Sequence, residues 1–167
     1  MISKDKYLTS EEIEDLKRLL KNDRDSLLIK LAFYTGARES ELVQLSKDSF
    51  NLKDGSVFIK GTKGSNDRDV DIPKELIRQI LDLENDKPFG VSTRMVRYIW
   101  SKYRLGKKGF HCLRHTFAIN TLEASKNIST VQVALGHKNI ANTLIYAKHV
   151  SYRNEMKAAA KKMQGKL

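Results

Sequence analysis

The sequence has few of the residues that cross-link chains or interrupt helices. Its 167 residues include one cysteine, Cys112, and two prolines, Pro73 and Pro88. A single cysteine excludes an internal disulfide, which fits a reducing compartment, and its apolar neighbours make Cys112 a small core residue rather than a nucleophile. Internal repeats, low-complexity stretches and Pro/Gly-rich joints are also missing. We therefore expect one domain, residues 1–167.

Long hydrophobic runs are missing as well. No stretch approaches eighteen consecutive apolar residues, and the N-terminus has no apolar signal core. These absences predict a cytoplasmic protein with no membrane partner.

The sequence does contain enough apolar residues for a core and an excess of positive charge. Apolar residues make up 40%, with six Tyr, six Phe and one Trp, which argues against a disordered tail. The formal charge is +11, from 31 Lys+Arg against 20 Asp+Glu. This surplus points to a polyanionic partner and salt-dependent binding, although a solvated lysine surface would give the same count.

Local patterns predict helices on both sides of a short β region. Thr9 and Glu12 form a capping-box pair ahead of apolar residues at helical spacing, and Gly36 is placed to end a second helix at about 24–34. Further helices are expected at about 38–45, 74–83, 92–103, 110–124, 129–135, 139–147 and 151–163.

The β region is expected to form three short strands. Asp54-Gly55 is a turn signal between β-prone runs at 50–52 and 57–59. A third run, 68–72, follows a polar, glycine-containing loop. The predicted fold is therefore mainly α with a small three-stranded antiparallel β-sheet (α+β).

Five residues lie in an order that suits attack on a phosphodiester: Arg38, His111, Arg114, His137 and Tyr146. A phosphoryl group in its transition state carries charge on its non-bridging oxygens, so positioning and fixed positive charge dominate catalysis. Arginine suits this task because its planar fork binds two oxygens and stays charged. His111 and Arg114 share one helix face near an N-terminus, where both reach one phosphate.

His111 and His115 also have the four-residue spacing of a metal pair. The glutamate of an HExxH motif is missing, because Cys112 and Leu113 follow His111. We therefore expect no metal, and we interpret His115 as a packed histidine bonded to the backbone.

Three segments together resemble the tyrosine recombinase (phage integrase) family. His111-Cys-Leu-Arg-His-Thr-Phe-Ala118 is similar to its HxLRHTFA signature, and Thr35-Gly-Ala-Arg-Glu-Ser-Glu-Leu42 to its TGxRxSEL box. Leu135-Gly-His137, followed by Thr143 and by Tyr146 nine residues after His137, resembles its LGH…T..Y box. The resemblance covers about residues 9–150 and implies the catalytic-domain fold of that family.

The resemblance implies metal-free DNA cleavage and rejoining through a 3′-phosphotyrosyl intermediate. Tyr146 is the implied nucleophile, and a free phenol with a pKa of about 10 loses its proton at pH 7 at a cost of about 4 kcal/mol. His111 is implied as the general base, Arg38 and Arg114 as clamps on the non-bridging oxygens, and His137 as a hydrogen-bond donor to one of them. Because the phosphotyrosyl bond keeps the energy of the broken bond, no cofactor is expected.

The leaving 5′ oxygen needs a proton, which the family takes from a lysine in a β-hairpin loop. We choose Lys63, at the tip between the second and third strands, and keep Lys60, nearer the strand end, as its rival. Glu41 is interpreted as an ion-pair or capping residue. A basic stretch is expected to contact DNA phosphates, although a solvated helix face explains it equally well: Arg94, Arg97, Lys102, Arg104, Lys107 and Lys108.

Members of this family normally carry an N-terminal helical domain that closes around DNA. Only a few residues precede Thr9, so we expect a catalytic domain without it. The expected partner is double-stranded DNA at the nucleoid, bound by a protein that is a monomer alone and a tetramer on synapsed DNA. The amphipathic segment 152–163 packs either on its own domain or on a neighbouring subunit.

Two other functions are compatible with parts of the pattern. A type IB topoisomerase would share the fold and site, but that class usually carries lysine where this chain has His111. A catalytically silent DNA-binding protein would keep the fold, and the complete set of catalytic residues argues against it.

Overall fold

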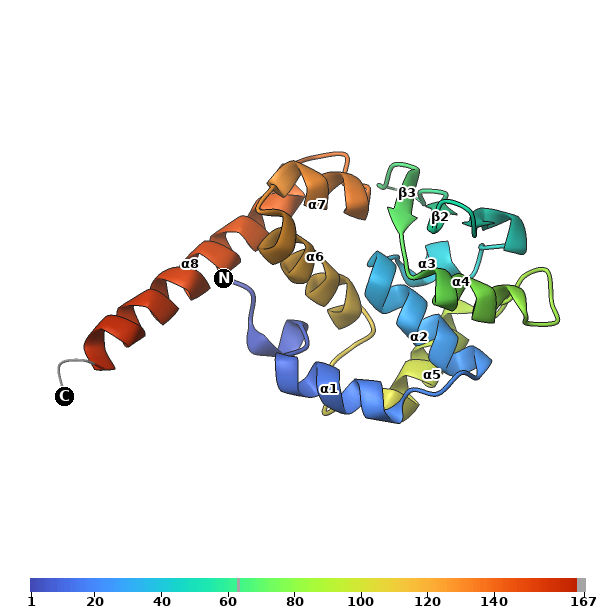
Figure 1. Ribbon diagram of the computed structural model, residues 1–167, viewed down its shortest axis with the longest axis horizontal. Coiled ribbons are helices and arrows are strands. Elements are labelled where there is room, and N and C mark those ends of the chain that lie inside the picture. Colours follow the sequence, from blue (N-terminus) through green and yellow to red (C-terminus); the bar gives the residue numbers. More distant parts are fainter. Residues whose placement is uncertain (63, 165–167) are drawn as a thin grey trace.

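The computed structural model describes residues 1–62 and 64–164, and it folds as helices packed around a small sheet (Figure 1). Short 3₁₀ turns, η1 and η2, cover Lys4–Lys6 and Lys47–Ser49. The helices are α1 (Ser10–Leu19), α2 (Arg24–Thr35), α3 (Glu39–Leu42), α4 (Lys74–Leu81), α5 (Thr93–Tyr103), α6 (Cys112–Ser125), α7 (Ile128–Leu135) and α8 (Ala141–Gln164). The strands are β1 (Phe50–Asn51), β2 (Ser56–Ile59) and β3 (Arg68–Asp71).

The ends of the first two helices follow the local signals in the sequence. The Glu12 amide donates to the Thr9 hydroxyl at 3.3 Å, and the Thr9 amide donates to the Glu12 carboxylate at 2.7 Å, so the predicted capping box is confirmed. Gly36 ends α2 with φ of 59°, in the left-handed region that glycine adopts without strain. A side chain at Gly36 would also collide with the ring of Phe117 on α6.

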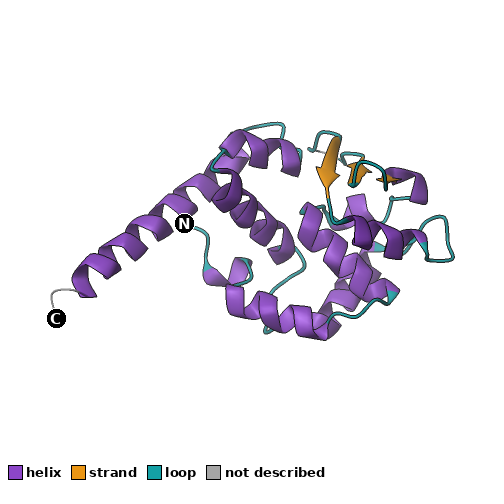
Figure 2. Ribbon diagram, in the orientation of Figure 1, coloured by secondary structure: helices purple, strands orange, loops and turns teal. Residues whose placement is uncertain are grey.

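The strands form one antiparallel sheet in the order β1-β2-β3, which confirms the predicted fold class (Figure 2). Phe50 pairs with Val57, and Val57 pairs with Val70. All three side chains are buried, so one face of the sheet contributes to the core. The α-helix expected at 38–45 is shorter, because α-helical hydrogen bonding gives way after Leu42 to bonds of 3₁₀ type: the Gln44 and Leu45 amides donate to carbonyls three residues earlier.

The buried apolar residues form two clusters that meet at α6. The larger cluster joins α2, the sheet, α4, α5 and the start of α6. The second joins the rest of α6 to α7, to α8 and to Ile2 and Tyr7 near the N-terminus. Phe117 packs against both. As a result, the segment that precedes Arg38 and the Tyr146 side chain belong to different halves of the core.

The C-terminal segment differs from the expectation of two helices at 139–147 and 151–163. One helix, α8, runs through both, because the intervening residues include no glycine or proline and His149 and Val150 are buried there. Beyond Val150 the described residues are exposed apart from the half-buried Arg153, and α8 projects away from the other helices (Figure 1). Among its described residues, the segment reaches the rest of the domain through Arg153, which lies 3.6 Å from Glu123 on α6, and its large apolar side chains are exposed.

No helix in the described part of the chain combines the length and apolar character needed to cross a bilayer.

Candidate active site

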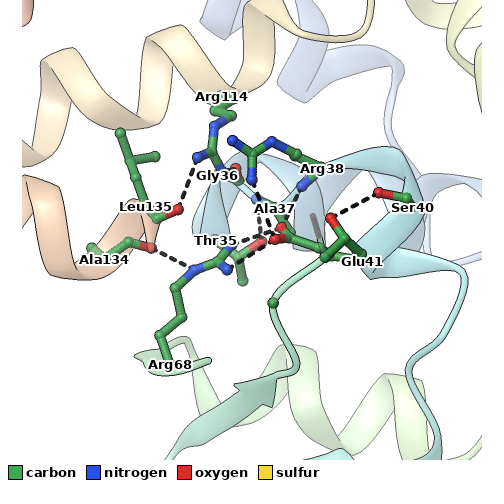
Figure 3. A network of polar contacts seen from close by, with 12 residues as sticks. Thr35, Gly36, Ala37, Arg38, Ser40, Glu41, Arg68, Arg114, Ala134 and Leu135 are labelled. Carbon is green, nitrogen blue, oxygen red and sulfur yellow. Dashed lines mark hydrogen bonds and ion pairs between the residues drawn. The ribbon is translucent and has the colours of Figure 1, made fainter. Parts of the chain in front are cut away.

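Arg114 lies at the junction of the two core clusters, on the first turn of α6. It is 2% exposed, and its guanidinium donates to the Gly36 carbonyl at 2.6 Å and the Leu135 carbonyl at 2.8 Å (Figure 3). These carbonyls lie at the C-terminal ends of α2 and α7, where helix dipoles favour a cation. Burial, followed by the charges of Arg38 and Arg68, lowers the pKa of Arg114 to about 10, so it remains charged at neutral pH.

Arg38 lies at the N-terminal end of α3 with its guanidinium beside Arg114 (Figure 3). Its backbone amide donates to Glu41 Oε2 at 2.8 Å, and its Nη1 lies 3.7 Å from Glu41 Oε1. Nη1 is buried, and it has no hydrogen-bond acceptor among the described residues. Since buried donors are normally satisfied, this atom is suited to bind an anion.

Glu41 contacts Arg38 directly and is itself held by a second arginine, Arg68, which was not among the expected site residues. Arg68, the first residue of β3, donates from Nη2 to Glu41 Oε2 at 2.8 Å and from Nη1 to Oε1 at 3.1 Å. Burial alone would raise the pKa of the Glu41 carboxyl, but the hydrogen bonds and charge of Arg68 outweigh it and hold that pKa below its usual value. The interpretation of Glu41 as an ion-pair and capping residue is confirmed.

Arg68 also connects the sheet to α7, because its Nε donates to the Ala134 carbonyl at 2.8 Å (Figure 3). A signal for it was present in the sequence. Arg68 shares the buried face of its strand with Val70, and a charged residue at an apolar position of an alternating strand normally has a buried partner.

His137 follows a tight turn at the end of α7. Gly136 has φ of 67°, and its carbonyl accepts from the Asn66 amide at 2.8 Å, which holds the β2–β3 loop beside this turn. The Nδ1 atom of His137 lies 2.9 Å from the Thr143 hydroxyl on α8. Burial, then the charges of Arg114 and Arg38, lower the pKa of His137 to about 4, so the ring is neutral at pH 7.

Tyr146 lies on α8 with its side chain turned inward, and it is 2% exposed. Burial raises the pKa of its phenol, although the charges of Arg114 and Arg38 oppose that rise. Its hydroxyl lies 3.0 Å from His115 Nδ1. The expectation of a backbone bond for the His115 side chain was therefore wrong: its partner is the expected nucleophile.

His111 directly precedes α6, and its ring meets that of His115 edge-on, with 4.9 Å between ring centroids. Partial burial, then the charges of Arg114 and Arg38, lower the pKa of His111. The structure thus brings together all the expected catalytic residues that it describes. They line a pocket of about 280 Å³, formed by Arg38, His111, Arg114, His115, His137, Ala141, Asn142, Ile145 and Tyr146.

The model of the phage integrase family matches residues 6–153 of the chain. The chain belongs to the phage integrase family. Tyrosine recombinase XerA of Thermococcus kodakarensis is 34% identical over 186 aligned positions, which cover 96% of this chain and 65% of XerA. The chain thus spans less than two thirds of the length of this relative.

Two solved structures have the same fold. The catalytic domain of bacteriophage HP1 integrase superposes with a TM-score of 0.69 at 25% identity, covering 93% of each chain. A pre-cleavage complex of XerH site-specific recombinase bound to difH substrate gives a TM-score of 0.63 at 28% identity, covering 84% of this chain and 50% of XerH. The expected catalytic-domain fold is confirmed.

The hairpin lysine of this integrase domain stays a prediction. Lys63 lies outside the described residues, and Lys60 is exposed just after β2. Among residues 1–62 and 64–164, no three His, Cys, Asp or Glu side chains are gathered in a way that would hold a metal ion.

The basic stretch of the integrase domain divides into paired and unpaired residues. Lys108 donates to the Tyr7 carbonyl and the Glu12 carboxylate, so its charge is used inside the protein. Two others are in exposed ion pairs, Arg97 with Glu39 at 2.8 Å and Lys102 with Asp25 at 3.4 Å. The remaining three are exposed: Arg94, Arg104 and Lys107.

Proposed function

We propose that this integrase domain is a site-specific recombinase that cleaves and rejoins DNA strands through Tyr146. The observation that carries the proposal is the pocket in which two arginines and three histidines surround a buried tyrosine hydroxyl. The XerH complex with its difH substrate supports DNA as the partner. We propose the nucleoid in the cytoplasm as its site of action, on the ground that its substrate is DNA.

The pocket is suited to a phosphodiester anion. Arg38 Nη1 supplies a free donor, and the hydrogens of Arg114 that do not reach Gly36 or Leu135 supply further donors. With Nδ1 accepting the Thr143 hydroxyl proton, His137 carries its own proton on Nε2 and donates it to a phosphate oxygen. Donors fixed before substrate arrives stabilise the charge of the transition state without reorganising during the reaction.

The reaction proceeds by two opposite transfers. The Tyr146 oxygen attacks phosphorus and loses its proton to a histidine of the pocket, the bond to the 5′ oxygen breaks, and the hairpin lysine, which we assign to Lys63, protonates the leaving oxygen. A 5′-hydroxyl then attacks the phosphotyrosyl bond and reverses the step. Neither transfer consumes a nucleotide, and the fixed arginine charges take the place of a metal ion.

We propose a monomer in isolation and a tetramer on two synapsed duplexes. The exposed half of α8 supports an intersubunit role, because Tyr152, Met156 and Met163 are large apolar side chains that lie exposed on it. Such a helix face is typical of a segment that docks in a groove of another subunit.

The test is covalent trapping on nicked DNA at low salt. Protein and end-labelled DNA are incubated and denatured with SDS, and we expect a covalent adduct on the 3′ side of the break. Tyr146→Phe should abolish the adduct. Tyr152→Phe, which changes an exposed tyrosine of the same helix, should retain it.

Two outcomes would overturn the proposal. DNA binding without any adduct would indicate a silent DNA-binding domain. Relaxation of supercoiled plasmid by a single protomer, with no strand exchange between two duplexes, would indicate a topoisomerase.

A further inference from the structure

The hydroxyl of Tyr146 contacts a histidine that carries no role in the mechanism above. His115 Nδ1 lies 3.0 Å from the Tyr146 hydroxyl, and among the described residues it is the one hydrogen-bond partner of that hydroxyl. Because Tyr146 is 2% exposed, bulk water has little access to the phenol. His111 touches the His115 ring edge-on and makes no hydrogen bond to Tyr146 in the described structure.

The protonation states around this contact follow from the groups that face it. Burial, then His111, then Lys6 on η1 and Arg114 on α6, lower the pKa of His115 to about 4, and burial raises that of Tyr146 on α8. At neutral pH, therefore, a neutral imidazole faces a neutral phenol.

The direction of the hydrogen bond is set by the need to satisfy the phenol. If His115 carried its proton on Nδ1, the buried Tyr146 O–H would have no acceptor among the described residues. Such unsatisfied donors are rare in folded proteins. The favoured arrangement places the imidazole proton on Nε2, and Tyr146 donates to Nδ1.

We propose that His115 accepts the proton of Tyr146 as the phenol oxygen attacks DNA, a role that the family resemblance gave to His111. This inference rests on the proposed function. The Tyr146 O–H bond breaks, its electron pair forms the bond to phosphorus, and the proton moves to His115 Nδ1. The 5′ oxygen leaves with the lysine proton, and in rejoining His115 returns its proton to Tyr146.

The surrounding charges make this transfer depend on substrate. Without DNA, burial of His115, and after it the charges of His111, Lys6 and Arg114, disfavour an imidazolium there, so Tyr146 keeps its proton. A bound phosphodiester brings negative charge into the same pocket, which favours the protonated histidine. The nucleophile is thus activated when the scissile phosphate is in place.

The first test needs no DNA cleavage. The chain has four histidines, so long-range ¹H–¹⁵N spectra of histidine-labelled protein resolve each ring. At pH 7 we expect His115 to be protonated on Nε2, and Tyr146→Phe to shift its Nδ1 resonance while leaving that of His149 unchanged. Protonation on Nδ1, or an Nδ1 resonance insensitive to Tyr146→Phe, would overturn the inference.

The second test separates proton transfer from positioning. His115→Asn keeps an acceptor oxygen close to the Nδ1 position but is not basic, and His115→Phe keeps only a ring. We expect both to reduce single-turnover adduct formation about 100-fold or more, with DNA affinity unchanged. A parental rate for His115→Asn would refute the proton-acceptor role, even if His115→Phe failed to fold. If the parent itself forms no adduct, the proposed function fails, and the spectra still decide the contact.

Discussion

At the scale of single residues, the Glu41–Arg68 pair decides whether the phosphate-binding arginines are held in place. Glu41 is 1% and Arg68 4% exposed, and two short hydrogen bonds join them. A buried ion pair adds little net stability, because desolvation offsets the attraction. Loss of one partner leaves a buried charge without compensation. The pair therefore serves to fix the position of Arg38 more than to stabilise the fold.

Replacing Arg68 by methionine should lower the free energy of unfolding by about 3–5 kcal/mol, because Glu41 remains buried and unpaired. The double replacement Glu41→Leu with Arg68→Met should recover most of that stability. It should not recover DNA cleavage, because the Arg38 amide loses its acceptor. Urea denaturation and covalent trapping measure the two effects.

Arg78→Met is the matched control, since Arg78 pairs with Glu75 on an exposed helix face at 3.4 Å. We expect a change below about 1 kcal/mol there. Equal losses at Arg68 and Arg78, or cleavage restored in the double variant, would contradict the positioning role.

His149 predicts a dependence of stability on pH. It is 2% exposed, both ring nitrogens lack partners among the described residues, and burial, then the charge of Arg153, lowers its pKa from 6.5. The unfolded state therefore binds protons more readily, so stability is complete above about pH 6.5 and falls as the pH drops below that value.

The replacement His149→Phe should flatten this acid loss in urea titrations between pH 7 and 5, while a ring still packs edge-on against Tyr7. Part of the decrease in stability at acid pH should remain in the variant, because the pKa values of His115 and His137 are also lowered, to about 4. Parallel curves for parent and variant would show that His149 does not contribute.

At the scale of elements, the turn after α7 positions the hairpin loop. Gly136→Ala would place its Cβ 2.7 Å from the Asn66 carbonyl oxygen, at a φ of 67°. Gly106→Ala, at a φ of 72° with open space around it, carries the backbone strain alone. We expect both to lose about 1–2 kcal/mol from strain, and Gly136→Ala to lose more and to cleave DNA more slowly.

Thermal unfolding and single-turnover trapping of these two variants provide the comparison. Equal effects at the two positions would mean that the contact between loop and turn does not matter for cleavage.

Local signals in the sequence predicted most elements but not the contacts between them. The Thr9 capping box, the Gly36 stop and the three strands depend on neighbouring residues, and all are confirmed. The partners of Arg68 and His115 come from distant segments, so no local pattern shows them. The continuity of α8 depends on the burial of His149 and Val150 against the rest of the fold.

At the scale of the whole molecule, a charge of +11 predicts DNA binding that weakens steeply with salt. The pairing pattern predicts which residues set the slope. Arg94→Ala and Arg104→Ala remove exposed charges, and each should lower the slope of log K against log salt by about 1.

Lys108→Ala serves as the control. Because Lys108 is bonded to Tyr7 and Glu12, this change should reduce stability and leave the salt slope unchanged. Fluorescence anisotropy at several salt concentrations measures the slopes. A lower slope for Lys108→Ala alone would show that Lys108, and not Arg94 or Arg104, contacts DNA phosphates.

The uninterrupted α8 has a mechanical consequence. Its 24 residues form a helix about 36 Å long, with Tyr146 near the N-terminal end and the exposed residues beyond Val150 at the other. The helix is continuous between these two parts, and it is held against the rest of the fold where His149 and Val150 are buried. A partner that binds the exposed end of α8 and tilts the helix about this buried segment would therefore displace Tyr146 at the other end.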